Sequence, residues 1–241
     1  MEHDRKIGII GGMGPAATWL FYRYVTEMTE ASCDQDHVNM VILSDAAMPD
    51  RTAAILSGKE EPVMKKMRED VKTLVGCGCE AVAVTCNTAH FFMEKVAKET
   101  QVPLIHMLEE TAKEAVCQAA GGKIAILATR GTIQTGLYQK RLESHGGHPF
   151  VPSEEIEALV MSQIYDRIKK GLPAEKEVWE KIAAYLRQEN CACAIMGCTE
   201  LSVVKEELHF SSYYIDPMRI PAGTARIHMG FILDFQYIVI T

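Results

Sequence analysis

Residues 84–88 read Val-Thr-Cys-Asn-Thr, and residues 196–200 read Met-Gly-Cys-Thr-Glu. In both places the cysteine follows a short apolar run that is typical of a buried strand. A polar residue able to cap a helix comes directly after it. Each half of the chain therefore places a thiol, Cys86 or Cys198, at a turn from strand to helix. The pKa of a thiol at such a turn is lowered from ~8.5 towards neutrality by the amides of the helix N-terminus.

Strand-like and helical runs alternate along the whole chain. The predicted strands span residues 6–12, 38–45, 80–85, 104–106, 123–128, 148–151, 192–197 and 213–215. The predicted helices span residues 15–31, 61–75, 88–99, 108–120, 132–145, 153–170, 174–188 and 199–207. Such alternation predicts an α/β protein whose parallel sheets are covered by helices. Because the pattern restarts after Gly121 and Gly122, we expect two pseudo-symmetric three-layer lobes.

The expected first lobe comprises residues 1–104 with 217–241, and the expected second lobe comprises residues 105–216. Ligands of open α/β sheets bind at the carboxyl ends of the strands, where both cysteines fall. The active site is therefore expected in the cleft between the lobes. Two thiols facing each other there could act as an acid–base pair.

The bulk composition excludes several classes of partner. A net charge of −7 over 241 residues argues against nucleic acid. No apolar run approaches the ~20 residues of a membrane span. Charged residues 2–6 lead straight into a strand, so we expect no signal peptide and a cytoplasmic protein.

Eight cysteines in a cytoplasmic protein are expected to be reduced. Residues 77–79 and 191–193 form C-x-C patterns, unlike the C-x-x-C of most zinc sites, so we expect no metal. The remaining cysteines are predicted to be small buried hydrophobic residues. They are Cys33, Cys77, Cys79, Cys117, Cys191 and Cys193.

A glycine loop over residues 11–18 follows the first strand. It fits the dinucleotide-binding pattern only loosely, since the acidic residue expected ~20 positions later is poorly placed and Pro15 would stiffen the loop. The simplest interpretation is a tight turn between the first strand and the first helix. We favour a loop whose amides and Met13 line a small pocket for an anion.

Polar residues beside the two thiols could hold a carboxylate. Asn87 and Thr88 supply amide and hydroxyl donors, and His90, one helical turn on, could tune the thiol of Cys86. Thr129 occupies the turn that mirrors the glycine loop, where it could also cap a helix. A lone cysteine at the end of a strand is more often core than catalyst, but the second motif is hard to explain by packing.

Two cations are candidates for gripping a second carboxylate. Arg51 follows the second strand, where an arginine can bind a carboxylate through two hydrogen bonds. Lys169 ends a predicted helix, and its position alone favours a surface lysine near the helix C-terminus.

Together these motifs resemble the aspartate/glutamate racemase family, most of all its cofactor-independent aspartate racemases. The resemblance runs from about residue 6 to residue 218, and the paired cysteine motifs are its most specific part. The motifs are residues 11–15 (Gly-Gly-Met-Gly-Pro), 49–52 (Pro-Asp-Arg-Thr), 86–88 (Cys-Asn-Thr), 128–132 (Ala-Thr-Arg-Gly-Thr) and 197–200 (Gly-Cys-Thr-Glu).

The resemblance implies a homodimer that uses neither pyridoxal phosphate nor a metal. It implies that Cys86 and Cys198 exchange protons with the substrate, with Cys198 serving the L-enantiomer. Arg51 and Lys169 match the positions that bind the second carboxylate of an acidic amino acid. The α-amino acid head is held at the positions of Asn87, Thr88 and Thr199.

The C-terminal tail departs from the family, which usually closes with an amphipathic helix. Residues 219–223 carry two helix breakers, and residues 231–241 are predicted to form a strand. Two rivals to a racemase remain at this stage. One is an enzyme of the maleate isomerase or arylmalonate decarboxylase type, and the other is a catalytically silent binder of small anions.

Overall fold

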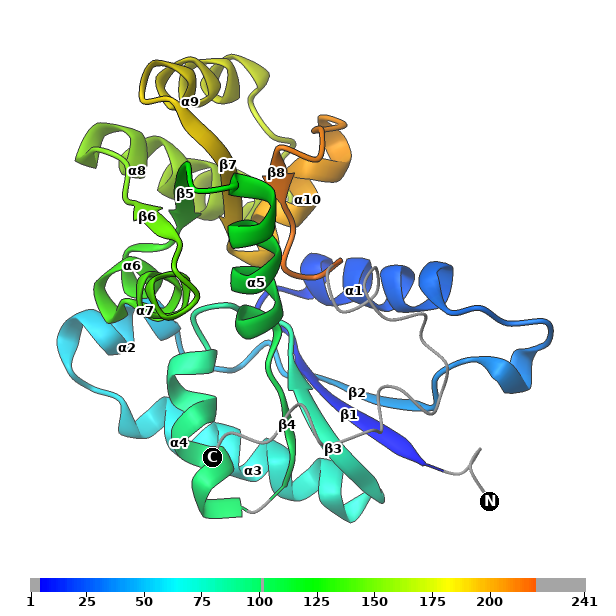
Figure 1. Cartoon of the computed structure of the whole chain (residues 1–241). Coiled ribbons are helices and arrows are strands. Elements are labelled where there is room, and N and C mark those ends of the chain that lie inside the picture. Colours follow the sequence, from blue (N-terminus) through cyan, green and yellow to red (C-terminus); the bar gives the residue numbers. More distant parts are fainter. Residues whose placement is uncertain (1–4, 101, 220–241) are drawn as a thin grey trace. The chain divides into compact units, whose positions relative to one another are not determined.

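The computed structural model of the protein describes residues 5–100 and 102–219 (Figure 1). They form two compact units. The first contains the residues up to His106 and resumes at Met218, and the second runs from Met107 to Pro217.

The first unit is built on a four-stranded parallel sheet with the strand order β2-β1-β3-β4. Its strands are β1 (Lys6–Gly11), β2 (Met40–Ser44), β3 (Cys79–Val84) and β4 (Leu104–Ile105). Its helices are α1 (Pro15–Met28), the 3-10 turn η1 (Asp34–Asp36), α2 (Arg51–Ser57), α3 (Glu61–Gly76) and α4 (His90–Thr100).

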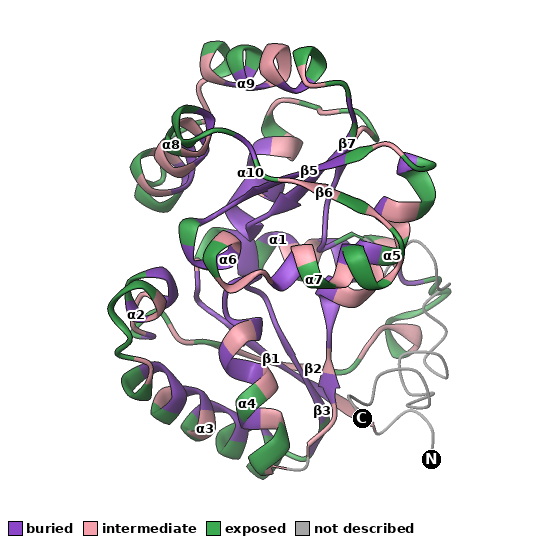
Figure 2. Cartoon of the chain, turned by 60° about the vertical axis from the view of Figure 1, so that its left-hand side comes forward, coloured by how far each residue is buried: buried purple, intermediate pink, exposed green. Residues whose placement is uncertain are grey.

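Helices cover both faces of this sheet, with α1 on one side and α3 and α4 on the other (Figure 1). Side-chain alternation along β1 explains the two layers, since neighbouring residues of a strand point to opposite faces. Ile10 belongs to the larger cluster, with Leu74 of α3 and Phe92 of α4. Ile9 belongs to the smaller cluster, against which Phe21 of α1 packs. Figure 2 shows that burial follows the central strands.

The second unit repeats the plan with the strand order β6-β5-β7-β8. Its strands are β5 (Lys123–Ala128), β6 (His148–Phe150), β7 (Cys191–Gly197) and β8 (Tyr214–Ile215). Its helices are α5 (Met107–Ala119), α6 (Arg130–Thr135), α7 (Leu137–Ser144), α8 (Glu154–Ser162), α9 (Lys176–Gln188) and α10 (Thr199–Glu207). A π-helical turn η2 (Gln163–Arg167) and a 3-10 turn η3 (Ile168–Lys170) continue α8.

One face of the second sheet packs against α8 and α9, where Val160 and Ile182 meet Ala194 of β7. On the other face, the thiol of Cys193 lies 3.7 Å from the carbonyl oxygen of Ala115 in α5. Burial raises the pKa of the Cys193 thiol to about 12, so this side chain stays neutral in the core.

The two units match in detail. In each, the two central strands shift register by one residue at their start, at Lys6 and Ile7 in β1 and at Lys123 and Ile124 in β5. The predicted fold class, two pseudo-symmetric α/β lobes with parallel sheets, is confirmed.

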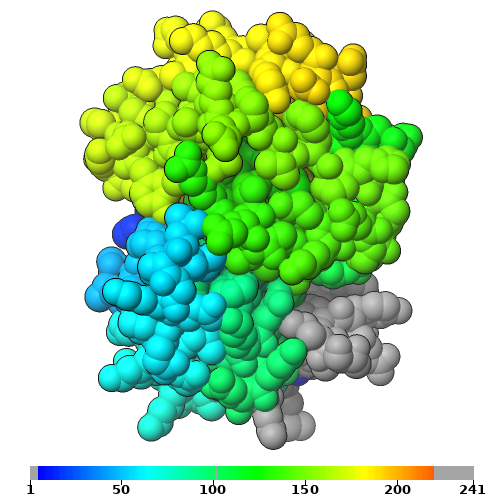
Figure 3. All heavy atoms as spheres, turned by 90° about the vertical axis from the view of Figure 1, so that its left-hand side faces the viewer, coloured from blue at the N-terminus to red at the C-terminus, as the bar shows by residue number. Residues whose placement is uncertain are grey.

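Several predicted elements differ from the observed ones. The predicted helix over 132–145 is two helices, because Gly136 adopts a left-handed conformation with φ of 69°. The predicted helix over 153–170 ends as regular α-helix at Ser162. Helix α2 was not predicted; together with α3 it forms part of the face of the first unit that Figure 3 shows. The predicted strand over residues 231–241 lies outside the described residues.

All eight cysteines are free thiols. The prediction that the six non-motif cysteines are buried is right for Cys79, Cys191 and Cys193. It is wrong for Cys33, Cys77 and Cys117, which are exposed. No helix within the described ranges is both long and apolar enough to cross a membrane.

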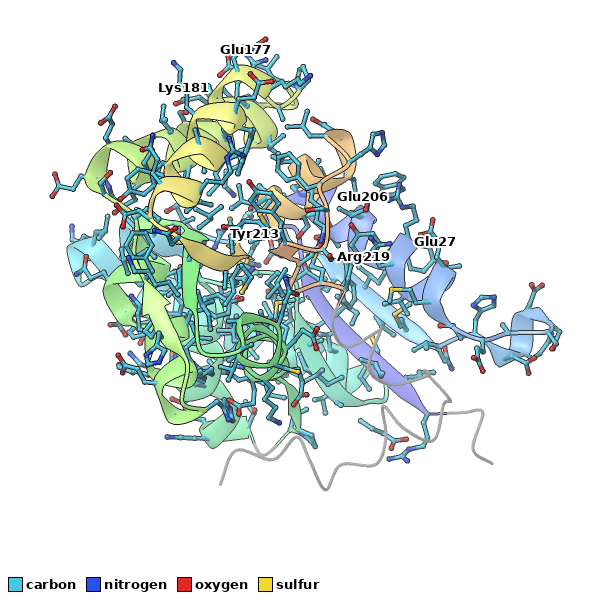
Figure 4. All side chains as sticks on the ribbon, turned by 45° about the horizontal axis from the view of Figure 1, so that its top comes forward. Glu27, Glu177, Lys181, Glu206, Tyr213 and Arg219 are labelled. Carbon is cyan, nitrogen blue, oxygen red and sulfur yellow. The ribbon has the colours of Figure 1, made fainter. Side chains whose placement is uncertain are left out.

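Near its end, the described chain is anchored by aromatic side chains. Tyr213 donates a hydrogen bond from its hydroxyl to the carbonyl of Cys191, at 3.2 Å, which ties the start of β8 to β7. Arg219 lies over the ring of Tyr24 in α1, 4.9 Å from its centroid (Figure 4). The last described residue is therefore held against the first helix.

Candidate active site

The first thiol lies in the loop between β3 and α4. Cys86 is buried, and the preceding residue, Thr85, donates its amide to the carbonyl of Ile10 at 3.0 Å. The Thr85 hydroxyl lies 3.3 Å from the hydroxyl of Thr18, which accepts a hydrogen bond from the amide of Gly12. The thiol loop, the glycine loop and the first turn of α1 are thus held together by hydrogen bonds.

The glycine loop is shaped by close packing. Gly12 has a φ of 83°, and a Cβ at this position would lie 2.4 Å from the backbone carbon of Asp45. A Cβ at Gly11 would lie 2.4 Å from a methyl carbon of Thr18. Met13, expected to line an anion pocket, is a buried member of the core of the first unit. Packing alone therefore accounts for the two glycines before Met13, and the Gly12 amide is already bonded to Thr18.

His90 supports the thiol loop through the backbone. It is fully buried at the start of α4, and its Nδ1 lies 2.9 Å from the carbonyl oxygen of Cys86. Its ring packs 4.6 Å from that of His106, whose Nε2 is 3.0 Å from the carboxylate of Glu94. This contact with the carbonyl gives His90 a role in fixing the loop that carries the thiol.

Arg51 is the first residue of α2 and is buried. Asp50 caps this helix by accepting a hydrogen bond from the amide of Ala53 at 2.7 Å. Nη1 of Arg51 donates to the carbonyls of Met48 and Pro49, at 3.1 and 2.8 Å. The guanidinium therefore holds the loop that leads out of β2.

An ionic cluster lies at the end of β2 and was not predicted. Lys66 pairs with Asp45 at 2.7 Å, and Asp45 is hydrogen-bonded to the buried Asp70 of α3. Burial, followed by the charge of Asp45, raises the pKa of Asp70 to about 6. Burial alone would raise the pKa of Asp45, but Lys66 and the amide of Ala47 lower it below its ordinary value. The cluster fixes the backbone against which Gly12 packs.

The second thiol begins a helix directly. Cys198 is the N-cap residue of α10, and its side chain makes no capping hydrogen bond to the helix. Its Sγ instead lies 2.9 Å from Oε2 of Glu200, as a hydrogen bond in which the thiol donates. The expectation that helix amides receive this thiol is wrong in this respect, because its hydrogen goes to the carboxylate of Glu200 in the first turn of the helix.

Glu200 is also bound to Lys169. Its Oε1 accepts a hydrogen bond from Nζ of Lys169 at 2.6 Å. Lys169 lies in the 3-10 turn after the π-helical turn, and its Nζ is 5.4 Å from the ring centroid of Tyr165. The sequence analysis assigned no role to Glu200; the signal for it is an acidic residue two positions after the cysteine, in the first turn of a helix.

The rest of this site is buried and well anchored. Thr129 is the N-cap of α6 and accepts from the amide of Thr132, which confirms the predicted capping role. Thr199 is the buried first residue of α10. One turn on, Ser202 donates to Asp216 at 2.7 Å, which fixes α10 to the end of β8.

Most predicted site residues lie in the loops and first helical turns that follow the parallel strands. In the first unit these are Met13, Arg51, Cys86, Asn87 and Thr88; in the second they are Thr129, Cys198 and Thr199. Lys169 lies in the 3-10 turn after α8 and contacts Glu200 at the start of α10. Over the described part of the chain, no group of three or more histidine, cysteine, aspartate or glutamate side chains is arranged to hold a metal ion.

One known protein family matches most of this chain. Residues 10–225 match the family described as Asp/Glu/Hydantoin racemase. The chain belongs to this family. The resemblance read from the motifs is thereby confirmed, and so is the enzyme class, an amino-acid racemase and hence an isomerase.

Characterised relatives and solved structures agree with this membership. The broad specificity amino-acid racemase RacX of Bacillus subtilis (strain 168) is 29% identical over 216 residues, which cover 87% of this chain and 92% of that protein. The glutamate racemase of Aquifex pyrophilus is 29% identical over 135 residues, covering 54% of this chain and 50% of that protein. The aspartate racemase of Picrophilus torridus superposes with a TM-score of 0.72 at 29% identity, covering 89% of both chains.

Proposed function

We propose that this protein racemises an acidic amino acid, aspartate first and glutamate second, without a cofactor, using Cys86 and Cys198 as its acid and base. One observation carries the proposal. In the first unit the buried thiol of Cys86 lies two residues after β3, and in the second unit the buried thiol of Cys198 lies directly after β7. Each of these strands pairs with the first strand of its own sheet, β1 or β5. A two-base reaction needs two groups that can exchange a proton, and each unit supplies one thiol.

The choice of substrate rests on the relatives. RacX and the Picrophilus aspartate racemase align over nearly the whole of this chain, whereas the glutamate racemase of Aquifex aligns over about half. Aspartate and glutamate differ by one methylene group, which a pocket discriminates by only ~1–3 kcal/mol. We therefore expect activity with aspartate and weaker activity with glutamate.

The chemistry follows from the weak acidity of the α-hydrogen. One thiolate removes it from one face of the α-carbon, and the other thiol delivers a proton to the opposite face. The charge that builds up on the α-carboxylate needs fixed donors, and we assign this role to Asn87, Thr88 and Thr199. Arg51 and Lys169 would hold the side-chain carboxylate, Met13 and Thr129 would line the pocket, and the substrate would bind with no metal or pyridoxal phosphate.

The two-thiol mechanism also bears on location and assembly. Both thiols must stay reduced, which a cytoplasmic location secures.

We further propose a homodimer, by analogy with the family. Light scattering coupled to size-exclusion chromatography should give twice the mass of one chain, and a monomeric mass would contradict this part of the proposal.

The direct test is a chiral assay on protein that has been dialysed against a chelator. L-Aspartate should convert to a racemic mixture with no added cofactor, and L-glutamate should convert more slowly. Activity that appears only after addition of pyridoxal phosphate would refute the proposal. Maleate and arylmalonate, offered in parallel, test the rival activities of the wider superfamily.

The two thiols can also be tested one at a time. Cys86→Ser and Cys198→Ser should each abolish racemisation, because serine is a far weaker base near neutral pH. Exchange of the α-hydrogen with solvent deuterium should persist weakly from the L-substrate in Cys86→Ser and from the D-substrate in Cys198→Ser. Proton NMR in deuterium oxide measures both. Racemisation near the wild-type rate in either variant would exclude the two-thiol mechanism.

A further inference from the structure

Glu200 is a charged side chain in the interior of the second unit. Only 2% of its surface is exposed. A buried carboxylate is costly unless hydrogen bonds and an opposite charge compensate for its lost hydration. Both of its oxygens are engaged: Oε1 by the ammonium of Lys169 at 2.6 Å, and Oε2 by the thiol of Cys198 at 2.9 Å. The three side chains form one chain of contacts, from ammonium to carboxylate to thiol.

The two thiol motifs differ at this position. The residue two places after the cysteine is Thr88 in the first motif and Glu200 in the second. The two motifs therefore differ at a position from which a charged side chain can act on the thiol of one motif. A reaction that starts with one thiol ionised and the other protonated needs such a difference.

We propose that Glu200 keeps Cys198 protonated in the free enzyme, so that Cys198 starts turnover as the proton donor and Cys86 starts as the base. Glu200 is thus a positioning residue for the thiol, and Lys169 acts on the thiol through Glu200. The part that concerns turnover rests on the proposed racemase function. Since the family resemblance assigns Cys198 to the L-enantiomer, the resting enzyme is the form that accepts the D-enantiomer.

The physical reason is the sign of the charge next to the thiol. A carboxylate that accepts the S–H hydrogen stabilises the neutral thiol and repels a thiolate at the same place. Lys169 offsets part of this charge from the far side of the carboxylate. The neighbouring Tyr138 of α7 is fully buried, which raises its pKa well above 10, so it stays neutral. Arg141, Asp216 and Cys198 act on Tyr138 through their charges, so these groups share one electrostatic environment.

The proton balance closes over one turnover. Cys86 as thiolate takes the α-hydrogen from one face, and Cys198 gives its S–H proton to the other. The product leaves an enzyme with Cys86 protonated and Cys198 ionised. Exchange of one proton with water at each thiol restores the starting form, in which Glu200 again accepts the hydrogen of Cys198.

Site-resolved alkylation tests the proposal without any substrate. The protein is treated with iodoacetamide over a series of pH values, and the peptides that contain Cys198 and Cys86 are quantified by mass spectrometry. In Glu200→Gln the midpoint of the pH profile for Cys198 should fall by about one pH unit or more, because the carboxylate charge is gone. In Lys169→Met it should rise, because the offsetting charge is gone.

Controls isolate the effect to one thiol. The Cys86 profile, read from the same digests, should not move in either variant. Glu207→Gln places the same substitution at the exposed end of the same helix, where Glu207 binds the amide of Ala174, and should leave the Cys198 profile unchanged. Glu200→Asp, which keeps the charge, should restore most of the wild-type midpoint.

The outcomes separate cleanly. An unchanged Cys198 midpoint in folded Glu200→Gln, or equal shifts of both cysteines, would overturn the proposal. If Glu200→Gln does not fold, as circular dichroism would show, the rise expected in Lys169→Met decides the matter, and its absence overturns the proposal. A protein that shows the alkylation shifts but never racemises an amino acid would refute the proposed function while the role of Glu200 in protonating Cys198 stands.

Discussion

Arg51 has an observed role in the fold, which is separate from the role proposed for it in binding the substrate. Its Nη1 is committed to the carbonyls of Met48 and Pro49, which orients the guanidinium before any substrate arrives. A side chain fixed in this way binds a carboxylate at a lower entropic cost than a mobile one. The same bonds mean that its removal also loosens the loop after β2.

We predict that Arg51→Ala weakens the use of aspartate by about 1.5–3 kcal/mol in kcat/KM, the scale of a hydrogen bond to a charged group. Use of a neutral amino acid, such as alanine, should fall much less. Steady-state kinetics on both substrates makes the comparison. Equal losses on the two would show that Arg51 acts only through the fold.

Single residues mark the limit of what the sequence can predict. The placement of Cys86 and Cys198 after β3 and β7 was predictable because a repeated motif marks both positions. The partnership of Glu200 with Lys169 was not, because the two residues are far apart in sequence and meet only when the turn after α8 packs beside α10. Lys169 read alone was an ordinary helix-terminal lysine, and only the folded chain shows which carboxylate it meets.

At the scale of elements, the glycine loop gives a sharp test of packing. Gly12 and Gly58 both have positive φ, at 83° and 70°, but a Cβ meets the backbone of Asp45 only at Gly12 and meets nothing within 4 Å at Gly58. Gly58→Ala should cost about 1–2 kcal/mol of unfolding free energy from backbone conformation alone. Gly12→Ala should cost clearly more, since the backbone must also shift. Urea denaturation compares them, and equal costs would contradict the close approach.

The cluster at the end of β2 predicts a pH-dependent stability. Because the pKa of Asp70 is raised to about 6, the folded protein binds this proton more tightly than the unfolded chain does. The stabilisation is fully present below the unfolded pKa, near 3.8, and is lost as the pH rises through about 6. Asp70→Asn, which mimics the neutral carboxyl, should therefore raise the unfolding free energy by roughly 1–3 kcal/mol at pH 8.

Little of that gain should appear at pH 4, where Asp70 is already protonated in the folded protein. Glu69→Gln, an exposed neighbour on α3 whose charge is the smallest of those that raise the pKa of Asp70, is the matched control and should show a much smaller pH-dependent gain. Denaturation curves at the two pH values measure the difference. A gain of the same size at both would mean that Asp70 affects stability by some route other than its proton.

Helices and strands were predictable where one sequence pattern is strong. They were less predictable where tertiary packing determines the backbone conformation. The strand β5 was predicted residue for residue because it is an apolar run, and so was the helix α10, which begins directly after the cysteine that follows β7. The region after Ser162 follows a helical period in sequence but forms π-helical and 3-10 turns. Bulges of the π-helical kind are frequent at functional sites, and this one leads directly into the 3-10 turn that carries Lys169.

At the scale of the whole molecule, two units with one topology carry different chemistry. In the first unit a histidine contacts the backbone carbonyl of the cysteine, and in the second unit a carboxylate accepts a hydrogen bond from the thiol itself. The sequence predicted the repeat, because periodicity and motif recur. It did not predict the asymmetry, because that depends on which side chains meet after folding.

This asymmetry must obey a thermodynamic limit. The two enantiomers of aspartate have the same free energy in water, so the equilibrium constant of racemisation is one. For wild-type protein and for any active variant, kcat/KM must then be equal for the L- and D-substrates. The unequal surroundings of the two thiols can therefore make kcat and KM differ between the two enantiomers only by the same factor.

We predict that kcat and KM each differ between L- and D-aspartate while their ratio does not. Glu200→Gln should change the difference between the two directions in both constants, because it changes which protonation form of the free enzyme is populated. Chiral chromatography of initial rates in each direction measures all four constants. Unequal ratios would show that one enantiomer is consumed by another reaction, and racemisation would then be only part of what this protein does.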